Sequence, residues 1–172
     1  MDRISKVKNT LFEMFEQRSY VDIKQDEQYI YAKDTENQTI RVKLDIVQKL
    51  NVAEMNSIVN ELQKDNIFHC IVIFEGTPTP AVKNLISTLP ELNINIELFH
   101  VENLLFNITK HVLVPKHEKI DKEQQKEFKK KFGINIPTLL KSDPITRFYN
   151  FKKGDIIRVT RNNGFISYRI VK

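Results

Sequence analysis

The run NIFHCIVIF, residues 66–74, constrains the fold of this chain more than any other stretch. Its second half lacks the polar alternation of a half-exposed strand, so it predicts a strand that is covered on both faces. Gly76 ends the run, Thr79 has the side chain of a helix N-cap, and Pro80 is a favoured first helical residue. An apolar stripe at helical spacing follows over residues 81–89. A buried strand that leads into a helix predicts a layered α/β domain.

Apolar patterns on both sides of this strand supply the other elements of such a domain. They predict helices over residues 3–17 and 51–64, a hairpin of residues 29–33 and 39–44, a strand over residues 93–99 and a short helix over residues 101–106. The element order is then helix, hairpin, helix, buried strand, helix and strand. We therefore expect a three-layer α/β domain over residues 1–106.

Residues 107–172 differ from residues 1–106 in that their predicted elements are short and prolines are frequent. They predict a short strand over residues 111–115, a charged helix between Asp121 and Gly133, short helical turns around Pro137 and Pro144, and a final hairpin of residues 155–161 and 165–171. The dipeptide Asn163-Gly164 joins the last two runs and is a strong hairpin signal. We expect a second, small α+β domain that ends in a β-hairpin, so the whole chain is a two-domain protein of the α+β or α/β class.

Composition limits the possible functions without selecting one. The chain has 172 residues, a net charge of +5 and a sequence pI of about 9.2, which is compatible with a nucleic-acid partner but does not require one. Cys70 is the only cysteine, so neither an internal disulfide nor a thiolate metal cluster can form. The first ten residues lack the apolar core of a signal peptide, and the longest apolar run, residues 71–74, is too short to cross a bilayer. We expect a soluble, intracellular protein.

His111 and His117 are the most conspicuous candidates for a site. On a strand, a spacing of six residues places them on one face about 20 Å apart, too far to share a metal ion. Neither a cysteine nor a carboxylate is placed to complete a tetrahedral site, so a partner-facing or hydrogen-bonding role is favoured over metal binding. His69 and His100 have no recognisable catalytic companions.

A nuclease is an alternative that the carboxylates support poorly. Metal-dependent cleavage of nucleic acid needs two or three carboxylates around a divalent ion, often with a lysine two residues after one of them. Asp22 has Lys24 at that spacing but lies in a polar stretch before the hairpin, and Glu75 is followed at two residues by Thr77. No glycine-rich nucleotide loop is present either.

Two segments are candidates for phosphate contact. The lysines of residues 122–132 alternate with Glu123 and Glu127, which favours a solvated helix face over a phosphate site. The loop that contains Thr77, Pro78 and Thr79 leads to a helix N-terminus and Lys83, where phosphate is attracted. Ordinary turn chemistry is the alternative explanation of this loop.

The sequence NITKHVLVPKHEKI, then LLKSDPITRFYNFKKGDIIRVTR, then SYRIV, resembles the C-terminal domain of the fifth-subunit family of DNA-directed RNA polymerases. This family comprises a small subunit shared by the eukaryotic nuclear polymerases and a shorter archaeal protein that is homologous to its C-terminal domain. The segments EGTPTPAVKNL and VENLLFNIT are similar to the N-terminal domain of the eukaryotic form. Three departures stand out: a short segment over residues 19–28, the compact hairpin loop RNNG, and Pro80 where the family has serine.

The resemblance implies a non-catalytic polymerase subunit. Its C-terminal assembly domain, residues 107–172, would dock on the largest subunit, and its N-terminal jaw, residues 1–106, would flank downstream duplex DNA. The jaw would have a nuclease-like topology with a mixed sheet but no active site. The residues nearest to DNA would be Thr77, Pro78, Thr79 and Lys83. The interface with the largest subunit would contain His111, Pro115, Lys116, His117, Lys141, Asp143, Pro144, Arg147 and Arg169.

The expected partners are therefore the largest subunit, the assembled polymerase and, weakly and without sequence specificity, duplex DNA. We expect no cofactor, no metal, no membrane contact and no homo-oligomer. The N-terminal domain argues against the shorter archaeal protein and favours a eukaryote, with a nuclear protein, or a large DNA virus, with a protein of the cytoplasm or virion. A free nucleic-acid-processing enzyme and a regulatory mimic of the polymerase component are the alternatives.

Overall fold

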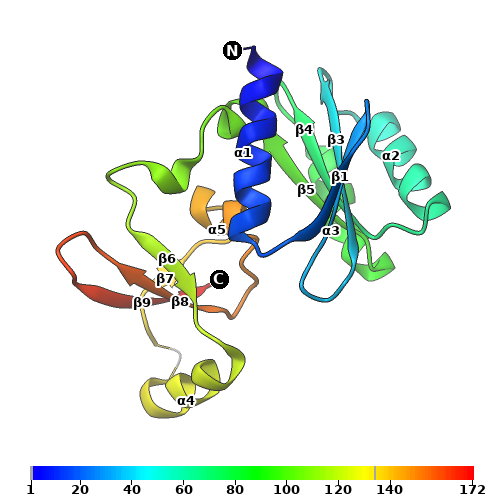
Figure 1. Cartoon of the computed structure of the whole chain (residues 1–172). Helices are drawn as coiled ribbons and strands as arrows, with labels where there is room; N and C mark the ends of the chain where they lie inside the picture. The colour runs from blue at the N-terminus through cyan, green and yellow to red at the C-terminus, as the bar shows by residue number, and fades with distance from the viewer. Residues whose placement is uncertain (1, 134) are drawn as a thin grey trace. The chain divides into compact units, whose positions relative to one another are not determined.

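A computed structural model describes residues 2–133 and 135–172 of the chain (Figure 1). The described chain forms two compact units, Met1–Phe106 and Asn107–Lys172, and each has a β-sheet of its own. No helix in the described part is long and apolar enough to span a bilayer.

The sheet of the first unit is mixed. Its strands are β1 (Val21–Gln25), β2 (Tyr29–Lys33), β3 (Thr39–Val47), β4 (His69–Phe74) and β5 (Asn95–His100), in that spatial order. The first three strands pair antiparallel, and β3, β4 and β5 pair parallel. All residues of β4 are buried, as the lack of polar alternation in this run predicts.

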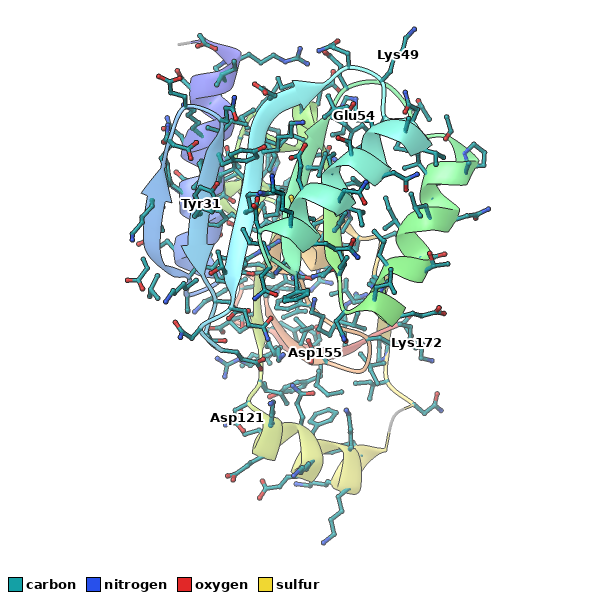
Figure 2. All side chains as sticks on the ribbon, turned by 90° about the vertical axis from the view of Figure 1, so that its right-hand side faces the viewer. Tyr31, Lys49, Glu54, Asp121, Asp155 and Lys172 are labelled. Atoms are coloured by element: carbon teal, nitrogen blue, oxygen red, sulfur yellow. The ribbon has the colours of Figure 1, made fainter. Side chains whose placement is uncertain are left out.

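Three helices complete the layers of the first unit. They are α1 (Arg3–Gln17), α2 (Val52–Lys64) and α3 (Pro80–Thr88), with α1 on one face of the sheet and α2 and α3 on the other (Figures 1 and 2). The crossovers through α2 and α3 step in the same direction along the sheet, so the right-handed rule places both helices on the same face. Between them and the sheet lies a core that includes Met55, Leu62, Val72 and Val82.

The predicted helix starts are confirmed, because each is fixed by a local cap. Asn51 Oδ1 accepts a hydrogen bond from the Glu54 amide at 2.9 Å, and Thr79 Oγ1 accepts one from the Val82 amide at 3.3 Å. The short helix expected near residue 101 is the 3₁₀-helix η2 (Val101–Leu104), and a second one, η1 (Leu89–Leu92), follows α3.

Strand β1 was not predicted: Val21 and Ile23 alternate with Asp22 and Lys24, but the run is short and lies in a mostly polar stretch. All five of its side chains are exposed, so burial does not define its two faces. It is defined by its pairing with β2, and it contains an irregularity between Val21 and Lys24 where Asp22 has a φ of 53°.

The second unit contains a four-stranded sheet in the order β6-β8-β9-β7. Its elements are the 3₁₀-helix η3 (Ile108–Lys110), β6 (Lys116–Lys119), α4 (Lys122–Phe132), β7 (Thr138–Leu139), α5 (Pro144–Tyr149), β8 (Ile156–Thr160) and β9 (Ile166–Val171). A small core of Leu139, Phe151, Ile157, Val159 and Val171 lies against this sheet. The predicted β8–β9 hairpin and the charged helix α4 are confirmed, the latter with Asp121 Oδ1 accepting from the Gln124 amide at 2.7 Å.

The strand predicted over residues 111–115 is wrong. These residues form a turn in which the Val114 amide donates to the His111 carbonyl at 2.9 Å, and β6 begins only after Pro115. Val112 and Leu113 are 74% and 82% exposed, so no burial favours an extended pairing there. Proline also lacks the N–H that a paired strand needs. The prediction of only short helical turns between Pro137 and Pro144 is also wrong, because Thr138–Leu139 form the strand β7. A strand of two residues carries no periodic signal.

Candidate functional site

The loop predicted to lie near DNA joins β4 to α3, at the carboxyl end of the central parallel strand. Open α/β sheets place their ligand sites at this end. Thr77, Thr79 and Lys83 are exposed and Pro78 is half-buried, so the structure brings all four to one short surface. The Thr79 hydroxyl oxygen caps α3 by accepting from the Val82 amide, and its O–H is still able to donate. The hydroxyls of Thr77 and Thr79 and the ammonium group of Lys83 are therefore the polar groups that this loop offers to a phosphate.

Glu75 lies beside this loop, and its charge is paired. Arg3 Nη1 donates to Glu75 Oε1 at 2.7 Å. Hydrogen bonds from Arg3 and Gln48 lower the pKa of Glu75. An ionised carboxylate so close to a phosphate would repel it, and the pairing with Arg3 offsets this repulsion in part.

The structure does not bring the two candidate nuclease carboxylates together. Asp22 is on the edge strand β1 and Glu75 follows β4, and the two intervening strands alone separate them by roughly 14 Å at the usual spacing. They also lie towards opposite ends of the sheet, since Asp22 is level with the start of β4 and Glu75 follows its end. Within residues 2–133 and 135–172, no group of three or more His, Cys, Asp or Glu side chains is arranged to hold a metal ion. Burial raises the pKa of the Cys70 thiol to about 12, which makes it a poor nucleophile.

A buried ionic cluster of Arg18, His69 and Glu97 is the feature of the first unit that sequence reasoning missed. Arg18 donates to both carboxylate oxygens of Glu97, at 2.9 and 2.8 Å, and His69 Nε2 lies 2.6 Å from Glu97 Oε1. Burial by itself raises the pKa of Glu97, but the Arg18 charge and the hydrogen bonds from His69 and Arg18 outweigh it and lower the pKa to about 2. The cluster joins the end of α1 to β4 and β5, so His69 has a structural role.

In the second unit, His117 lies among several of the predicted interface residues. Its Nδ1 is 2.8 Å from the Pro115 carbonyl oxygen, and since a carbonyl only accepts, Nδ1 is the donor. Burial lowers the pKa of His117, the hydrogen bond with Pro115 and the charge of Asp143 oppose this, and the charge of Arg169 lowers the pKa further. Asp143 and Arg169, which are distant in sequence, are therefore electrostatic neighbours of this ring.

Lys141, Asp143, Pro144 and Arg147 lie in α5 or just before it. Asp143 caps α5 by accepting from the Ile145 amide at 2.8 Å, and Pro144 is the first residue of the helix. The Arg147 amide donates to the Asp143 carbonyl at 2.9 Å, and Lys141 is exposed just before this turn. Arg169 Nη1 donates to the Thr138 carbonyl at 3.3 Å, which fixes its guanidinium near β7.

Lys116 and His111 do not join this group. Successive residues of a strand point to opposite faces, so Lys116 lies on the other face of the sheet from His117. There its Nζ is 2.7 Å from Glu118 Oε1, and Glu118 Oε2 accepts from Arg158 at 2.8 Å. His111 accepts a hydrogen bond from the Leu113 amide at 3.2 Å within the turn. Each histidine thus orders its own local backbone.

Four exposed apolar residues lie at the hairpin end of the second sheet, and sequence reasoning missed them. They are Val112, Leu113, Phe165 and Ile166, and we call them the apolar tip. Asn162 Nδ2 donates to the Val112 carbonyl at 3.1 Å, which holds the turn against the β8–β9 hairpin. Exposed apolar groups that gather in this way mark a contact with another molecule. Apolar residues in sequence predict a core, so their exposure could not be foreseen.

Known proteins similar to this chain are polymerase subunits. Residues 106–171 match the family described as RNA polymerase Rpb5, C-terminal domain. The chain is 34% identical to a putative DNA-directed RNA polymerase subunit of Invertebrate iridescent virus 6, over 93% of this chain and 95% of the viral protein. It is 24% identical to a subunit of DNA-directed RNA polymerases I, II and III of Dictyostelium discoideum, over 99% of this chain and 98% of that protein.

A plant relative gives the same result over a shorter region. The chain is 30% identical to subunit 5B of DNA-directed RNA polymerases IV and V of Arabidopsis thaliana, over 64% of this chain and 52% of the plant protein. The match with the viral protein covers both units. The family match covers the segment that contains His117, its neighbours Asp143 and Arg169, and the apolar tip. The chain therefore belongs to the fifth-subunit, or Rpb5, family of DNA-directed RNA polymerases.

Proposed function

We propose that this chain is a non-catalytic subunit of a multisubunit RNA polymerase, with an assembly domain in residues 107–172 and a jaw in residues 1–106. The assembly domain docks on the largest subunit, and the jaw flanks downstream duplex DNA. The observation that carries the proposal is the combination of fixed polar groups and exposed apolar groups within the segment that matches the family.

The apolar tip supplies the affinity of the docking contact. Leu113 is 82% exposed and Val112 is 74% exposed, and burying a side chain of this size stabilises a contact by about 1.5–3 kcal/mol. His117, Asp143 and Arg169 supply direction, since the hydrogen bonds described above hold them in place before the partner arrives. Lys141, Pro144 and Arg147 extend this surface along the start of α5.

The jaw contacts DNA weakly. Residues 1–106 contain 11 lysines and arginines and 16 acidic residues, a net charge of −5, so the unit as a whole does not attract a duplex. The loop of Thr77, Pro78 and Thr79, with Lys83, offers a few groups that position a phosphate backbone without reading its sequence. The proposed jaw has a nuclease-like topology, and the separation of Asp22 from Glu75 supports a role as a DNA guide.

The docking proposal is tested by co-purification of the full chain with the largest subunit of its polymerase. Leu113→Asp places a charge in the apolar tip and is expected to weaken the complex about tenfold or more. Leu92→Asp is the matched control, because Leu92 is 57% exposed in the first unit. Retention of the Leu113→Asp variant at the level of the control would contradict the proposal.

The stoichiometry of the complex tests whether the chain is a subunit, and DNA binding tests the role of the jaw. A fixed one-to-one ratio with the catalytic core is expected for a subunit, and a substoichiometric ratio would favour a regulatory mimic. The isolated chain is expected to bind duplex DNA weakly, with a steep loss of affinity as salt rises. A tight, sequence-specific duplex complex at physiological salt, or metal-dependent cleavage lost on Glu75→Gln, would refute the proposed role of the jaw.

A further inference from the structure

The two units carry opposite net charges. Residues 107–172 contain 16 lysines and arginines and only six acidic residues, a net charge of +10, against −5 for residues 1–106. The docking surface proposed above uses few of these basic groups. Five of the others are on α4, whose sequence is KEQQKEFKKKF, and a surplus of positive charge of this size favours a polyanionic partner.

Three aromatic rings form a continuous row on the same part of the second unit. The ring centroids of Phe132 and Phe128 are 4.8 Å apart, and those of Phe128 and Tyr168 are also 4.8 Å apart. Phe128 and Tyr168 are half-buried, which holds α4 against β9, whereas Phe132 is 56% exposed. The row therefore presents an open ring at the C-terminal end of α4. Figure 2 marks the N-cap of this helix, Asp121.

Exposed lysines lie at the same helix end as the open ring. Lys131 Nζ is 5.2 Å from the centroid of the Phe132 ring, and Lys130, the residue before Lys131, is also exposed. Lys129 donates to the Gly154 carbonyl at 2.8 Å and so fixes the position of the helix end. Arg158 lies across the strands from Tyr168, at the other end of the aromatic row, and its guanidinium is paired with Glu118 at 2.8 Å. The surface combines a fixed helix end, an exposed aromatic face and exposed positive charge.

We propose that this α4 surface, formed by Phe128, Lys130, Lys131, Phe132 and Tyr168, binds single-stranded nucleic acid. An aromatic face beside a basic stripe is the usual way in which proteins bind single strands, since bases stack on the ring and phosphates meet the lysines. A duplex keeps its bases stacked on one another, so it would gain only the phosphate contacts. An acidic protein surface would form ion pairs with the lysines, but its carboxylates would not stack on the Phe132 ring.

The test is fluorescence anisotropy of the full chain with labelled oligouridine and oligothymidine of about 12 nucleotides, and with a duplex of the same length. Phe132→Ala is expected to weaken binding of both single strands about tenfold and to leave duplex binding unchanged. Phe106→Ala is the matched control, because Phe106 is also 56% exposed but belongs to the acidic unit. Circular dichroism checks that each variant is folded.

The lysines are tested separately through salt dependence. The double variant Lys130→Ala/Lys131→Ala is expected to reduce the slope of log affinity against log salt by about 1.4 for single strands. Comparison of oligouridine with oligothymidine shows whether RNA or DNA is the better ligand. The proposal is wrong if the chain binds neither strand, if it binds the duplex as tightly, if Phe132→Ala has no effect, or if polyglutamate competes as well as oligouridine.

Discussion

The two units of this chain use charge in opposite ways. Each arginine of the first unit forms an ion pair with a carboxylate: Arg3 with Glu75, Arg18 with Glu97, and Arg41 with Asp65. The second unit has far too few carboxylates to neutralise its 16 basic residues. The first unit therefore pairs all three of its arginines within its own fold, whereas the second keeps a large surplus of positive charge. The overall charge of +5 conceals this difference.

The largest effect is expected from removing the charge at the centre of the first unit. Glu97→Gln leaves the buried Arg18 without its bidentate partner, and breaking a buried pair in this way costs about 3–5 kcal/mol. The free energy of unfolding measured by urea denaturation would report this loss. Glu75→Gln is the control, because its ion pair with Arg3 is solvent-exposed and its loss is expected to change stability little. Similar losses in the two variants would contradict the structural role of the Glu97 cluster.

The same cluster makes the first unit sensitive to acid. The folded pKa of Glu97 is about 2, below its reference value of 4.5, so ionised Glu97 stabilises the fold above pH 4.5, and this contribution is lost as the pH falls from 4.5 towards 2. The difference amounts to about 3 kcal/mol. Acid titrations of stability for the wild type and Glu97→Gln would be compared, and the variant is expected to lack most of this dependence. Parallel titration curves would show that other carboxylates are responsible.

In the second unit, a neutral side chain provides the next largest expected effect. Gln125 is buried, donates to the Ile120 carbonyl at 2.8 Å and accepts from the Ile156 amide at 3.3 Å, so it joins α4 to β8. Gln125→Ala leaves both backbone groups unsatisfied and is expected to destabilise this unit by about 1–3 kcal/mol. Hydrogen exchange of the α4 and β8 amides would localise the effect. Gln124→Ala is the control, because Gln124 is exposed. Equal effects of the two changes would contradict the proposed link between α4 and β8 through Gln125.

The smallest expected effect is the loss of stability on removal of a helix N-cap, which should be equal in the two units. Asn51→Ala removes the cap of α2, and Asp121→Ala removes the cap of α4. A cap acts only on its own first turn, so each change is expected to cost about 1 kcal/mol, measured by thermal unfolding. A much larger loss for Asp121→Ala would mean that long-range charge in the basic unit also contributes, which would sharpen the contrast between the units.

Much of the secondary structure could be predicted because its signals are local. Asn51, Thr79 and Asp121 cap their helices through amides three residues away, and Gly133 ends α4 with a φ of 70°. The Asn163-Gly164 turn and the apolar run of β4 are equally local. The residues of the proposed DNA contact lie within seven residues of one another, from Thr77 to Lys83, so their proximity in space follows from the chain itself. Their roles in binding stay predictions.

The sequence by itself thus determined the helix boundaries, the hairpins and, through its motifs, membership of the polymerase-subunit family. Only the tertiary structure decided that β1 is a strand, that residues 111–115 form a turn, and that Glu97 meets Arg18, 79 residues away. It also decided which side of the second sheet His117 and Lys116 each face. The physical reason is range: caps and turns act within a few residues, whereas edge pairing, ion pairs across the fold and exposure of apolar side chains exist only once distant segments are brought together.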